Sequence, residues 1–238
     1  MPDKTNAAND HAGRVREMFS GIAKRYDLLN HLLSGNVDKR WRRIVATKVR
    51  EKLPTSNARV LDVACGTGDL SLTLFEITGA RVIGTDFCRP MLEIAARKSP
   101  HPIPWIEGDA LNLPFQDGSF DAVTIAFGLR NLASFESGLA ELRRVLKPGG
   151  WAGVLEFSRP ANAVLRPVFG LYFTKVLPLM GGLISGSHYA YSYLPASVQK
   201  FPDQQQLSLL MQRAGFDQVE FENLTGGIAA FHMGRRPE

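Results

Sequence analysis

The stretch that decides the fold is Arg59-Val60-Leu61-Asp62-Val63-Ala64-Cys65-Gly66-Thr67-Gly68-Asp69-Leu70. Residues 59–64 form a short run of mainly apolar, partly β-branched side chains, which is typical of a buried parallel strand. The two glycines that follow predict a tight turn, and the leucines from Leu70 onward suit a helix that packs back onto a sheet. This order of strand, turn and helix predicts an α/β domain with its ligand site at the carboxyl edge of the sheet.

The residues of the turn indicate which ligand it binds. A dinucleotide fingerprint would need a glycine where this chain has Ser71, and a phosphate-binding loop would need a Gly-Lys-Ser/Thr sequence. Asp62 offers a carboxylate to a cationic or hydroxyl-bearing ligand, while Gly66 and Gly68 lack a Cβ and let a small molecule lie against the backbone. The order D-x-A-x-G-x-G resembles the first motif of S-adenosylmethionine-dependent methyltransferases, in which a glycine often stands where this chain has Ala64. The alternative is an ordinary strand-to-helix turn.

Acidic residues follow the next two predicted strands. Residues 80–85 form a buried run that ends at Asp86, where a carboxylate can accept hydrogen bonds from both hydroxyls of a ribose. The alternative role for Asp86 is to cap the following helix, and the two roles are compatible. A third strand at 103–107 leads to Asp109 and Ala110, and a carboxylate there is placed to accept a hydrogen bond from the exocyclic amine of an adenine.

The fourth predicted strand, residues 120–126, ends where a substrate would meet a ligand bound along this edge. It runs into Phe127-Gly128-Leu129-Arg130-Asn131, which contains a cation and an amide. The later predicted elements are a helix capped by Ser134, a fifth strand at 151–157, a helix opening with the capping box Asp203-Gln204-Gln205-Gln206, and strands near 219–221 and 228–233.

Length and composition fit one domain. The chain has 238 residues and is 45% hydrophobic, which is enough for a single large α/β domain. We predict a disordered polar tail at residues 1–10 and one domain over 11–238. The two cysteines and five scattered histidines cannot form a disulfide framework or a four-cysteine zinc site, so we predict no metal. The absence of an apolar N-terminal signal region favours a cytoplasmic protein.

Positive charge gathers near the N-terminus. The first fifty residues hold eleven Lys or Arg against five Asp or Glu, a net charge of +6, and because the whole chain carries +5 the remainder carries −1. Apolar residues recur at helical spacing here, so we predict a helical N-terminal cap over 11–52. The run Lys39-Arg40-Trp41-Arg42-Arg43 could attract nucleic acid or an anionic lipid surface, or it could be a solvated helix face.

Six separated stretches together resemble the ubiquinone/menaquinone biosynthesis C-methyltransferase family, and the resemblance covers nearly the whole chain. They are residues 19–30 (Phe-Ser-Gly-Ile-Ala-Lys-Arg-Tyr-Asp-Leu-Leu-Asn), 61–69, 113–115, 127–131, 201–204 (Phe-Pro-Asp-Gln) and 223–227 (Asn-Leu-Thr-Gly-Gly).

The resemblance implies a class I methyltransferase fold, a Rossmann-like seven-stranded sheet with an antiparallel last strand. It also implies S-adenosylmethionine as cofactor and methylation of a ring carbon of a prenylated quinol. Thr67, Asp86, Asp109 and Ala110 would be cofactor-binding positions. Ala126 stands where the family often has a serine, so a side-chain hydrogen bond at that place is lost.

The chemistry of such a transfer suggests roles for Arg130 and Asn131. A quinol ring carbon becomes nucleophilic when a neighbouring hydroxyl loses its proton, and a phenol has a pKa of about 10, so the phenolate needs stabilising at neutral pH. Arg130 could stabilise it as a fixed cation and Asn131 could orient the oxygen. The alternative for Arg130 is a structural salt bridge at a strand end. Arginine is a poor general base, so the proton acceptor stays unassigned.

An apolar stretch, residues 167–184, lies inside a predicted substrate-side insertion at 161–200. Lys175 at its middle, two prolines and three glycines argue against a membrane span. It suits a wall or lid for an isoprenoid tail, or a core or dimer contact. The aromatic run Tyr191-Ser192-Tyr193-Leu194 closes the same pocket or serves ordinary packing.

We therefore predict C-methylation of demethylmenaquinol, with a polyprenyl benzoquinol of ubiquinone biosynthesis as the nearest alternative substrate. A transient contact with the membrane surface would give access to a prenylated quinol. An RNA or DNA methyltransferase is the alternative of another class. The end of the fourth strand has neither an Asn-Pro-Pro-aromatic clamp nor a nucleophilic cysteine, so we expect no nucleic-acid partner.

Overall fold

The fold is built on one seven-stranded sheet, described in a computed structural model that covers residues 4–23, 27, 34–55, 57–160, 170–171 and 188–238. The strand order is β3-β2-β1-β4-β5-β7-β6, and β7 runs antiparallel to both of its neighbours. The strands are β1 Arg59–Val63, β2 Arg81–Asp86, β3 Trp105–Glu107, β4 Phe120–Ala126, β5 Leu146–Phe157, β6 Asp217–Leu224 and β7 Ala229–Arg235. The predicted class I sheet with an antiparallel last strand is confirmed.

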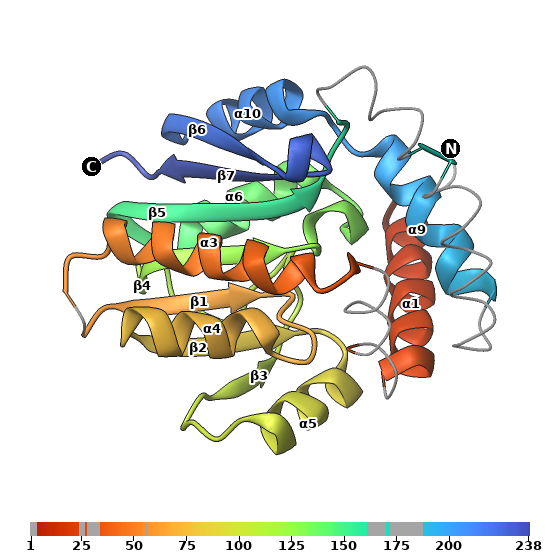
Figure 1. Ribbon diagram of the computed structural model, residues 1–238, viewed down its shortest axis with the longest axis horizontal. Coiled ribbons are helices and arrows are strands. Elements are labelled where there is room, and N and C mark those ends of the chain that lie inside the picture. Colours follow the sequence, from red (N-terminus) through yellow and green to blue (C-terminus); the bar gives the residue numbers. More distant parts are fainter. Residues whose placement is uncertain (1–3, 24–26, 28–33, 56, 161–169, 172–187) are drawn as a thin grey trace.

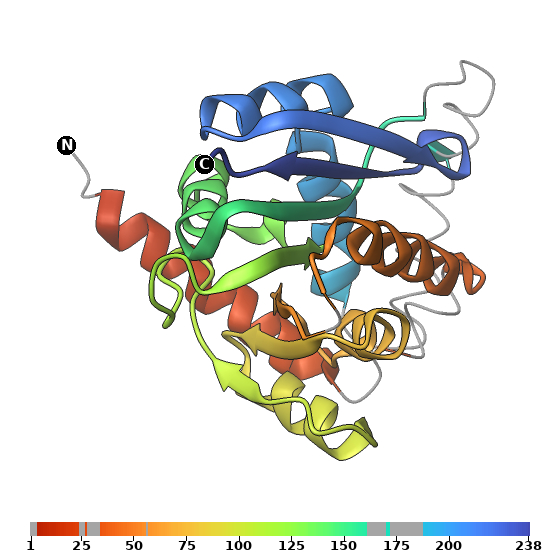
Figure 2. The same ribbon diagram turned by 90° about the vertical axis from the view of Figure 1, so that its left-hand side faces the viewer.

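Helices cover both faces of the sheet, with α3 and α4 on one face and α6 and α10 on the other (Figures 1 and 2). The helices are α1 Lys4–Ile22, α3 Val37–Lys52, α4 Asp69–Thr78, α5 Arg89–Lys98, α6 Phe135–Val145, α9 His188–Lys200 and α10 Gln204–Arg213, with the short 3-10 turns η2 Leu129–Asn131 and η4 Thr225–Gly227. Each face buries its own apolar core. Leu139 and Leu207 belong to one core, and Val45 and Leu74 belong to the other.

The caps predicted from the sequence are formed. The hydroxyl of Ser134 accepts a hydrogen bond from the N–H of Ser137 at the start of α6. Asp203 and Gln206 form both bonds of the capping box that opens α10. Strand β5 begins at Leu146 rather than at Trp151, because Leu146 already pairs with Phe120 before the register shifts.

The N-terminus differs from the prediction. Helix α1 begins at Lys4, so the prediction of a disordered tail over residues 1–10 is wrong for residues 4–10. Residues 4–12 contain no glycine or proline and include several alanines, so helix propensity lets the apolar periodicity further along extend backward. Helix α1 lies beside α9 beyond the carboxyl end of the parallel strands (Figure 1) and also contacts α5.

The apolar stretch at 167–184 lies almost entirely outside the described residues, as does most of the insertion predicted at 161–200. Within the ranges that are described, no helix is both long enough and apolar enough to cross a membrane.

Candidate active site

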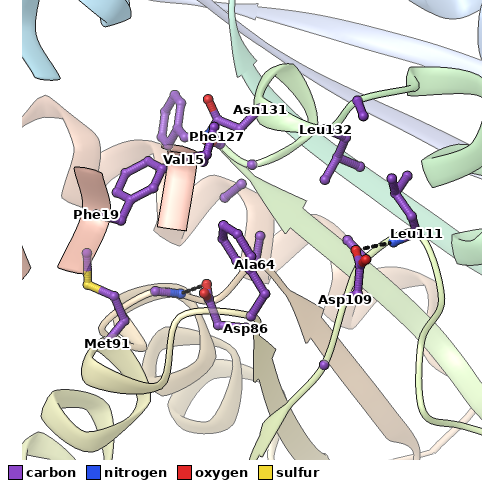
Figure 3. A pocket seen from close by; sticks show the side chains of 17 residues that line it. Val15, Phe19, Ala64, Asp86, Met91, Asp109, Leu111, Phe127, Asn131 and Leu132 are labelled. Atoms are coloured by element: carbon purple, nitrogen blue, oxygen red, sulfur yellow. Dashed lines mark hydrogen bonds between the residues drawn. The ribbon is translucent and has the colours of Figure 1, made fainter. Parts of the chain in front are cut away.

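A pocket opens at the carboxyl ends of β1, β2 and β4, at the edge of the sheet where the sequence predicted a ligand site (Figure 3). Five residues singled out from the sequence are among those that line it: Gly66, Asp86, Asp109, Ala110 and Asn131. They lie at or just after the carboxyl ends of β1, β2, β3 and β4, which the parallel sheet brings to one edge.

Helix α1 completes the wall of this pocket. Val15 and Phe19 project from α1 into the pocket (Figure 3). Phe87 and Met91 add further apolar surface to its lining. The guanidinium of Arg16 lies 5.4 Å from the centre of the Phe87 ring, a cation–π contact that ties the helix to the loop after β2. The N-terminal helical segment is therefore part of the site.

Asp86 is the last residue of β2, and two backbone groups hold its carboxylate. The N–H of Gly66 donates to Oδ2 and the N–H of Cys88 donates to Oδ1, each at 2.8 Å. Burial raises the pKa of Asp86 to about 6, although these hydrogen bonds act in the opposite direction. Cys88 is the N-cap residue of α5. Because each carboxylate oxygen can accept a second hydrogen bond, Asp86 can serve the helix start and still accept ribose hydroxyls.

Asp109 stands across the pocket from Asp86, in the turn that follows β3 (Figure 3). Its Oδ1 accepts a hydrogen bond of 2.9 Å from the N–H of Leu111, which fixes the direction of the carboxylate. Ala110 is buried next to it. Two carboxylates on opposite sides of a partly apolar pocket match the hydroxyls and the exocyclic amine of an adenosine.

A smaller pocket adjoins the first one, since Ala64, Gly66, Ala126 and Phe127 line both. The residues that line only the smaller pocket are Arg42, Asp62, Cys65, Thr67, Asp69 and Leu70. Their side chains carry one cation and two carboxylates, whereas the larger pocket is mainly apolar. The two pockets together fit a ligand with a nucleoside at one end and a small charged group at the other.

Asp62 is buried beneath the glycine turn. Its carboxylate accepts hydrogen bonds from Ser71 at 2.6 Å and from Thr124 at 2.8 Å, which joins β1 to α4 and β4. Burial raises the pKa of Asp62 to about 6 against the effect of these two bonds. The hydroxyl of Thr67 donates to the carboxylate of Asp27, a residue of the N-terminal segment. Both predicted cofactor residues thus lie at the smaller pocket, engaged with other side chains.

The two glycines of the turn have different roles. Gly66 has a φ of 56° and lines both pockets, as predicted. Gly68 has a φ of 84° and lies outside both sets of lining residues. A Cβ at Gly68 would overlap the ring of Trp105 in β3. The missing Cβ of Gly68 therefore makes room for Trp105, and a role of Gly68 in binding the cofactor stays a prediction.

Arg130 and Asn131 occupy different places although they are adjacent. Asn131 lines the larger pocket, whereas the Arg130 side chain is only 7% exposed and pairs with Glu156 at 2.8 Å. A second bond of 2.5 Å joins Arg130 Nη1 to the carbonyl oxygen of Phe127. Burial raises the pKa of Glu156, and the adjacent guanidinium of Arg130 acts against this rise. The structure thus contains the structural salt bridge weighed as the alternative role for Arg130.

Asn131 is held from two sides at the pocket wall. Its Nδ2 donates to the carbonyl oxygen of Phe127, and its Oδ1 accepts a hydrogen bond from the hydroxyl of Tyr193 in α9, each at 3.2 Å. Tyr193 is therefore a residue of the aromatic run at 191–194 that contacts this part of the site. Asn131 can therefore present its amide to a ligand in a fixed orientation.

Phe127 was not predicted as a site residue, yet it lies where the two pockets meet. It has a φ of 55°, an uncommon conformation for a bulky residue, and its ring packs against Trp41 and Phe157 at centroid distances of 6.0 and 4.7 Å. Trp41 also donates from Nε1 to the hydroxyl oxygen of Thr225 at 2.9 Å. The stretch 223–227 therefore supports the site through α3, without lining either pocket.

Arg42 and Glu156 were not predicted as site residues, and Phe127 and Tyr193 were named only within longer runs. Arg42 and Glu156 nevertheless carried a signal in the sequence. Glu156 is a charged residue near the end of an apolar strand, and Arg42 lies between Trp41 and Val45 with Asp38 one turn before it. Phe127 was marked only by its place at the end of the fourth strand, and Tyr193 only by the aromatic run around it. Among the residues that the structure describes, no group of three or more His, Cys, Asp or Glu side chains is arranged to hold a metal ion.

Comparison of the sequence with known proteins gives close relatives. Residues 5–236 match the model of the ubiE/COQ5 methyltransferase family. A demethylmenaquinone methyltransferase of Thermus thermophilus is 54% identical over 92% of this chain and 100% of its own length. One from Deinococcus radiodurans is 48% identical over 94% of this chain and 93% of its own. A ubiquinone/menaquinone biosynthesis C-methyltransferase of Geotalea uraniireducens is 42% identical over 94% of this chain and 96% of its own.

Solved structures of more distant sequence share the fold. An S-adenosylmethionine-dependent methyltransferase of Thermotoga maritima aligns over 92% of this chain and 99% of its own, with a TM-score of 0.64 and 19% identity. A phosphoethanolamine N-methyltransferase of Haemonchus contortus, solved with S-adenosylmethionine, aligns over 81% of this chain and 52% of its own, with a TM-score of 0.59 and 14% identity. At these identities the likeness concerns the architecture of the sheet and its helices.

Proposed function

Because the chain belongs to the ubiE/COQ5 methyltransferase family, we propose that it transfers a methyl group from its cofactor, S-adenosylmethionine, to a ring carbon of demethylmenaquinol. The observation that carries this proposal is the 54% identity to a demethylmenaquinone methyltransferase over that protein's whole length. The residues present fit the cofactor. Asp86 and Asp109 both line the larger pocket, and charged residues line the adjoining smaller pocket.

The cofactor supplies an electrophilic methyl group on its sulfonium, so the protein must mainly orient the acceptor carbon in line with that methyl. In our proposal Asp86 holds the ribose hydroxyls and Asp109 the adenine amine. The quinol ring enters at the rim formed by Phe127 and Asn131, which line the larger pocket. Asn131 donates a hydrogen bond to the quinol oxygen next to the carbon that is methylated.

Arg130 has a positioning role in this proposal. Its buried pairing with Glu156 and its bond to the Phe127 carbonyl support the loop that carries Asn131. Because Glu156 pairs with the guanidinium, Arg130 holds the loop of Asn131 in place and does not touch the quinol oxygen itself.

The proposal also says which quinol ring is methylated, a naphthoquinol rather than a benzoquinol. Some relatives are named for both quinone pathways, such as the Geotalea uraniireducens protein at 42% identity, while those at 54% and 48% are named for demethylmenaquinone alone. The names of the two relatives at 54% and 48% identity favour the naphthoquinol. The test is a competition in which the purified enzyme receives equal amounts of a reduced demethylmenaquinone and a reduced polyprenyl benzoquinone of equal tail length. Preferential methylation of the naphthoquinol supports the proposal, and preference for the benzoquinol assigns the chain to ubiquinone synthesis.

The substrate resides in a bilayer, so we also propose that this cytoplasmic enzyme docks transiently on the membrane surface. Lys39, Arg40 and Arg43 are exposed on the N-terminal half of α3, near the smaller pocket that Arg42 lines. Arg42 itself is buried, so it is not part of this basic face. Each exposed cation near an anionic surface contributes about 1 kcal/mol of binding free energy, which suits reversible attachment. Nucleic acid is not part of the proposal.

A further inference from the structure

Arg42 is an arginine of α3 that the fold buries, and we propose that it binds the carboxylate at the amino-acid end of S-adenosylmethionine. Its residue exposure is 8%, whereas Lys39, Arg40 and Arg43 on the same helix are exposed. Burying a guanidinium is costly unless anionic partners surround it. The burial of Arg42 therefore requires anionic groups around it, whereas water solvates its exposed neighbours.

Arg42 already has one close partner and one distant partner. Its Nη1 pairs with Asp38, one helical turn before it, and the same atom lies 3.5 Å from Oδ2 of Asp69. The Asp69 carboxylate has a shorter contact elsewhere, since Lys98 Nζ donates to its Oδ1 at 2.5 Å. Asp38 therefore orients the guanidinium, while the contact with Asp69 is long and can be exchanged for a ligand.

Arg42 lines the smaller pocket. Among the described residues that line this pocket, Arg42 is the one that carries a positive charge. Gly66 lies between the two pockets, so a cofactor whose ribose is held by Asp86 extends past Gly66 toward Arg42. Its amino-acid end carries a carboxylate, and the planar guanidinium is suited to pair with such a group.

The acidic residues of the smaller pocket complement the rest of the amino-acid group. Asp62 and Asp69 give the pocket two carboxylates against one guanidinium. A cofactor with an ammonium and a sulfonium brings two positive charges, and its single carboxylate needs one cation. The charge pattern of the pocket is thus the complement of the ligand, with Arg42 at the place of the only anionic group.

The inference rests on the cofactor of the proposed function, and its test measures binding of that cofactor rather than methylation of a quinol. Calorimetric titration compares S-adenosylmethionine with decarboxylated S-adenosylmethionine, which differs only by the carboxylate. We expect the parent to bind the complete cofactor more tightly than the decarboxylated form. Arg42→Gln should weaken binding of the complete cofactor by about tenfold to a hundredfold, the range of a hydrogen bond to a charged group, and leave the decarboxylated form nearly unchanged.

Two further variants keep the test decisive. Arg42→Gln removes one charge of the pair with Asp38, so the double variant Asp38→Asn with Arg42→Gln removes both charges and should show the same selective loss. Arg50→Gln changes an exposed arginine of the same helix and should keep the parent's preference for the carboxylate. Equal losses for both ligands in the folded variants, or no loss for either, would overturn the proposal and leave Arg42 as a structural partner of Asp38.

Discussion

Asp86 shows how one carboxylate can serve both the fold and the cofactor. It accepts backbone hydrogen bonds from Gly66 and Cys88, and burial places its pKa near 6. Ribose hydroxyls donate their hydrogens, so they bind the ionised carboxylate better than the protonated acid. A carboxylate with this pKa is mostly ionised at pH 7.5 and mostly protonated at pH 5.

We therefore expect the affinity for S-adenosylhomocysteine to fall as the pH drops through about 6, by up to roughly tenfold per pH unit below that value. Asp86→Asn should bind about 1.5 to 3 kcal/mol more weakly at pH 7.5 and should lose most of this pH dependence. Calorimetric titration from pH 5 to 8 is the measurement. The control is Glu107→Gln, an exposed carboxylate at the end of the neighbouring strand. A folded Asp86→Asn protein with the parent's affinity would remove Asp86 from the site.

The burial of the Arg130–Glu156 pair predicts how its loss changes the free energy of unfolding. Arg130→Met should lower the free energy of unfolding by about 3 to 5 kcal/mol, because Glu156 would keep a buried charge without its partner. Replacing both, with Arg130→Met and Glu156→Gln, should recover most of that loss. Urea unfolding gives both values. The control is Lys147→Met, which breaks the more exposed pair with Asp121 and should cost less than about 1 kcal/mol. Equal costs for the two single variants would contradict the buried pair.

At the scale of single elements, the glycine turn between β1 and α4 depends on a strand two places away in the sheet. Gly68 has a positive φ, and its α-hydrogen faces Trp105 where a Cβ would overlap the ring. Gly79, at the other end of α4, also has a positive φ of 65° but has no atom within 4 Å of an added Cβ. The two glycines form a matched pair that differs in packing.

Gly79→Ala should therefore cost about 1 to 2 kcal/mol of unfolding free energy, the price of a left-handed conformation. Gly68→Ala should cost about 1 to 3 kcal/mol more, because Trp105 must also move. Chemical denaturation of the two variants measures the difference. If both variants lose the same stability, Trp105 is not what excludes a side chain at Gly68.

The sheet and its edge could be predicted from the sequence for a simple reason. Parallel strands place their carboxyl ends together, so Asp86, Asp109 and Asn131 were expected to meet once their strands were identified. The role of Gly68 could not be predicted, because Trp105 is far along the chain and only the packed sheet brings the two together. Arg42 and Tyr193 likewise come from helices before and after the central strands. Their approach to the site depends on tertiary packing that local patterns do not encode.

At the scale of the whole molecule, the exposed cations of α3 make the membrane proposal testable. The variant Lys39→Gln, Arg40→Gln, Arg43→Gln keeps Arg42, so the lining of the smaller pocket is unchanged. We expect the parent to pellet with anionic liposomes at low salt and to be released at high salt, because each cation contributes about 1 kcal/mol and salt screens the attraction. The triple variant should remain in the supernatant.

The matched control changes three exposed arginines elsewhere, Arg81, Arg97 and Arg213, to Gln. It lowers the net charge by the same amount and should still pellet. Equal loss in both triple variants would mean that overall charge, rather than the face on α3, governs attachment. If the parent does not pellet with anionic liposomes at low salt, the basic face is only a solvated helix surface and does not bind membranes.

Methylation of a quinol ring carbon by this enzyme can be observed directly. The most direct measurement is a single-turnover reaction of the purified enzyme with S-adenosylmethionine carrying a deuterated methyl group and a reduced short-chain demethylmenaquinone. Mass spectrometry and NMR of the extracted product then locate the label. We expect a deuterated methyl bonded to the ring carbon that lies between the prenylated carbon and a carbon bearing a quinol hydroxyl. A label on a quinol oxygen, or an unlabelled quinone after incubation with folded, cofactor-bound enzyme, would contradict it.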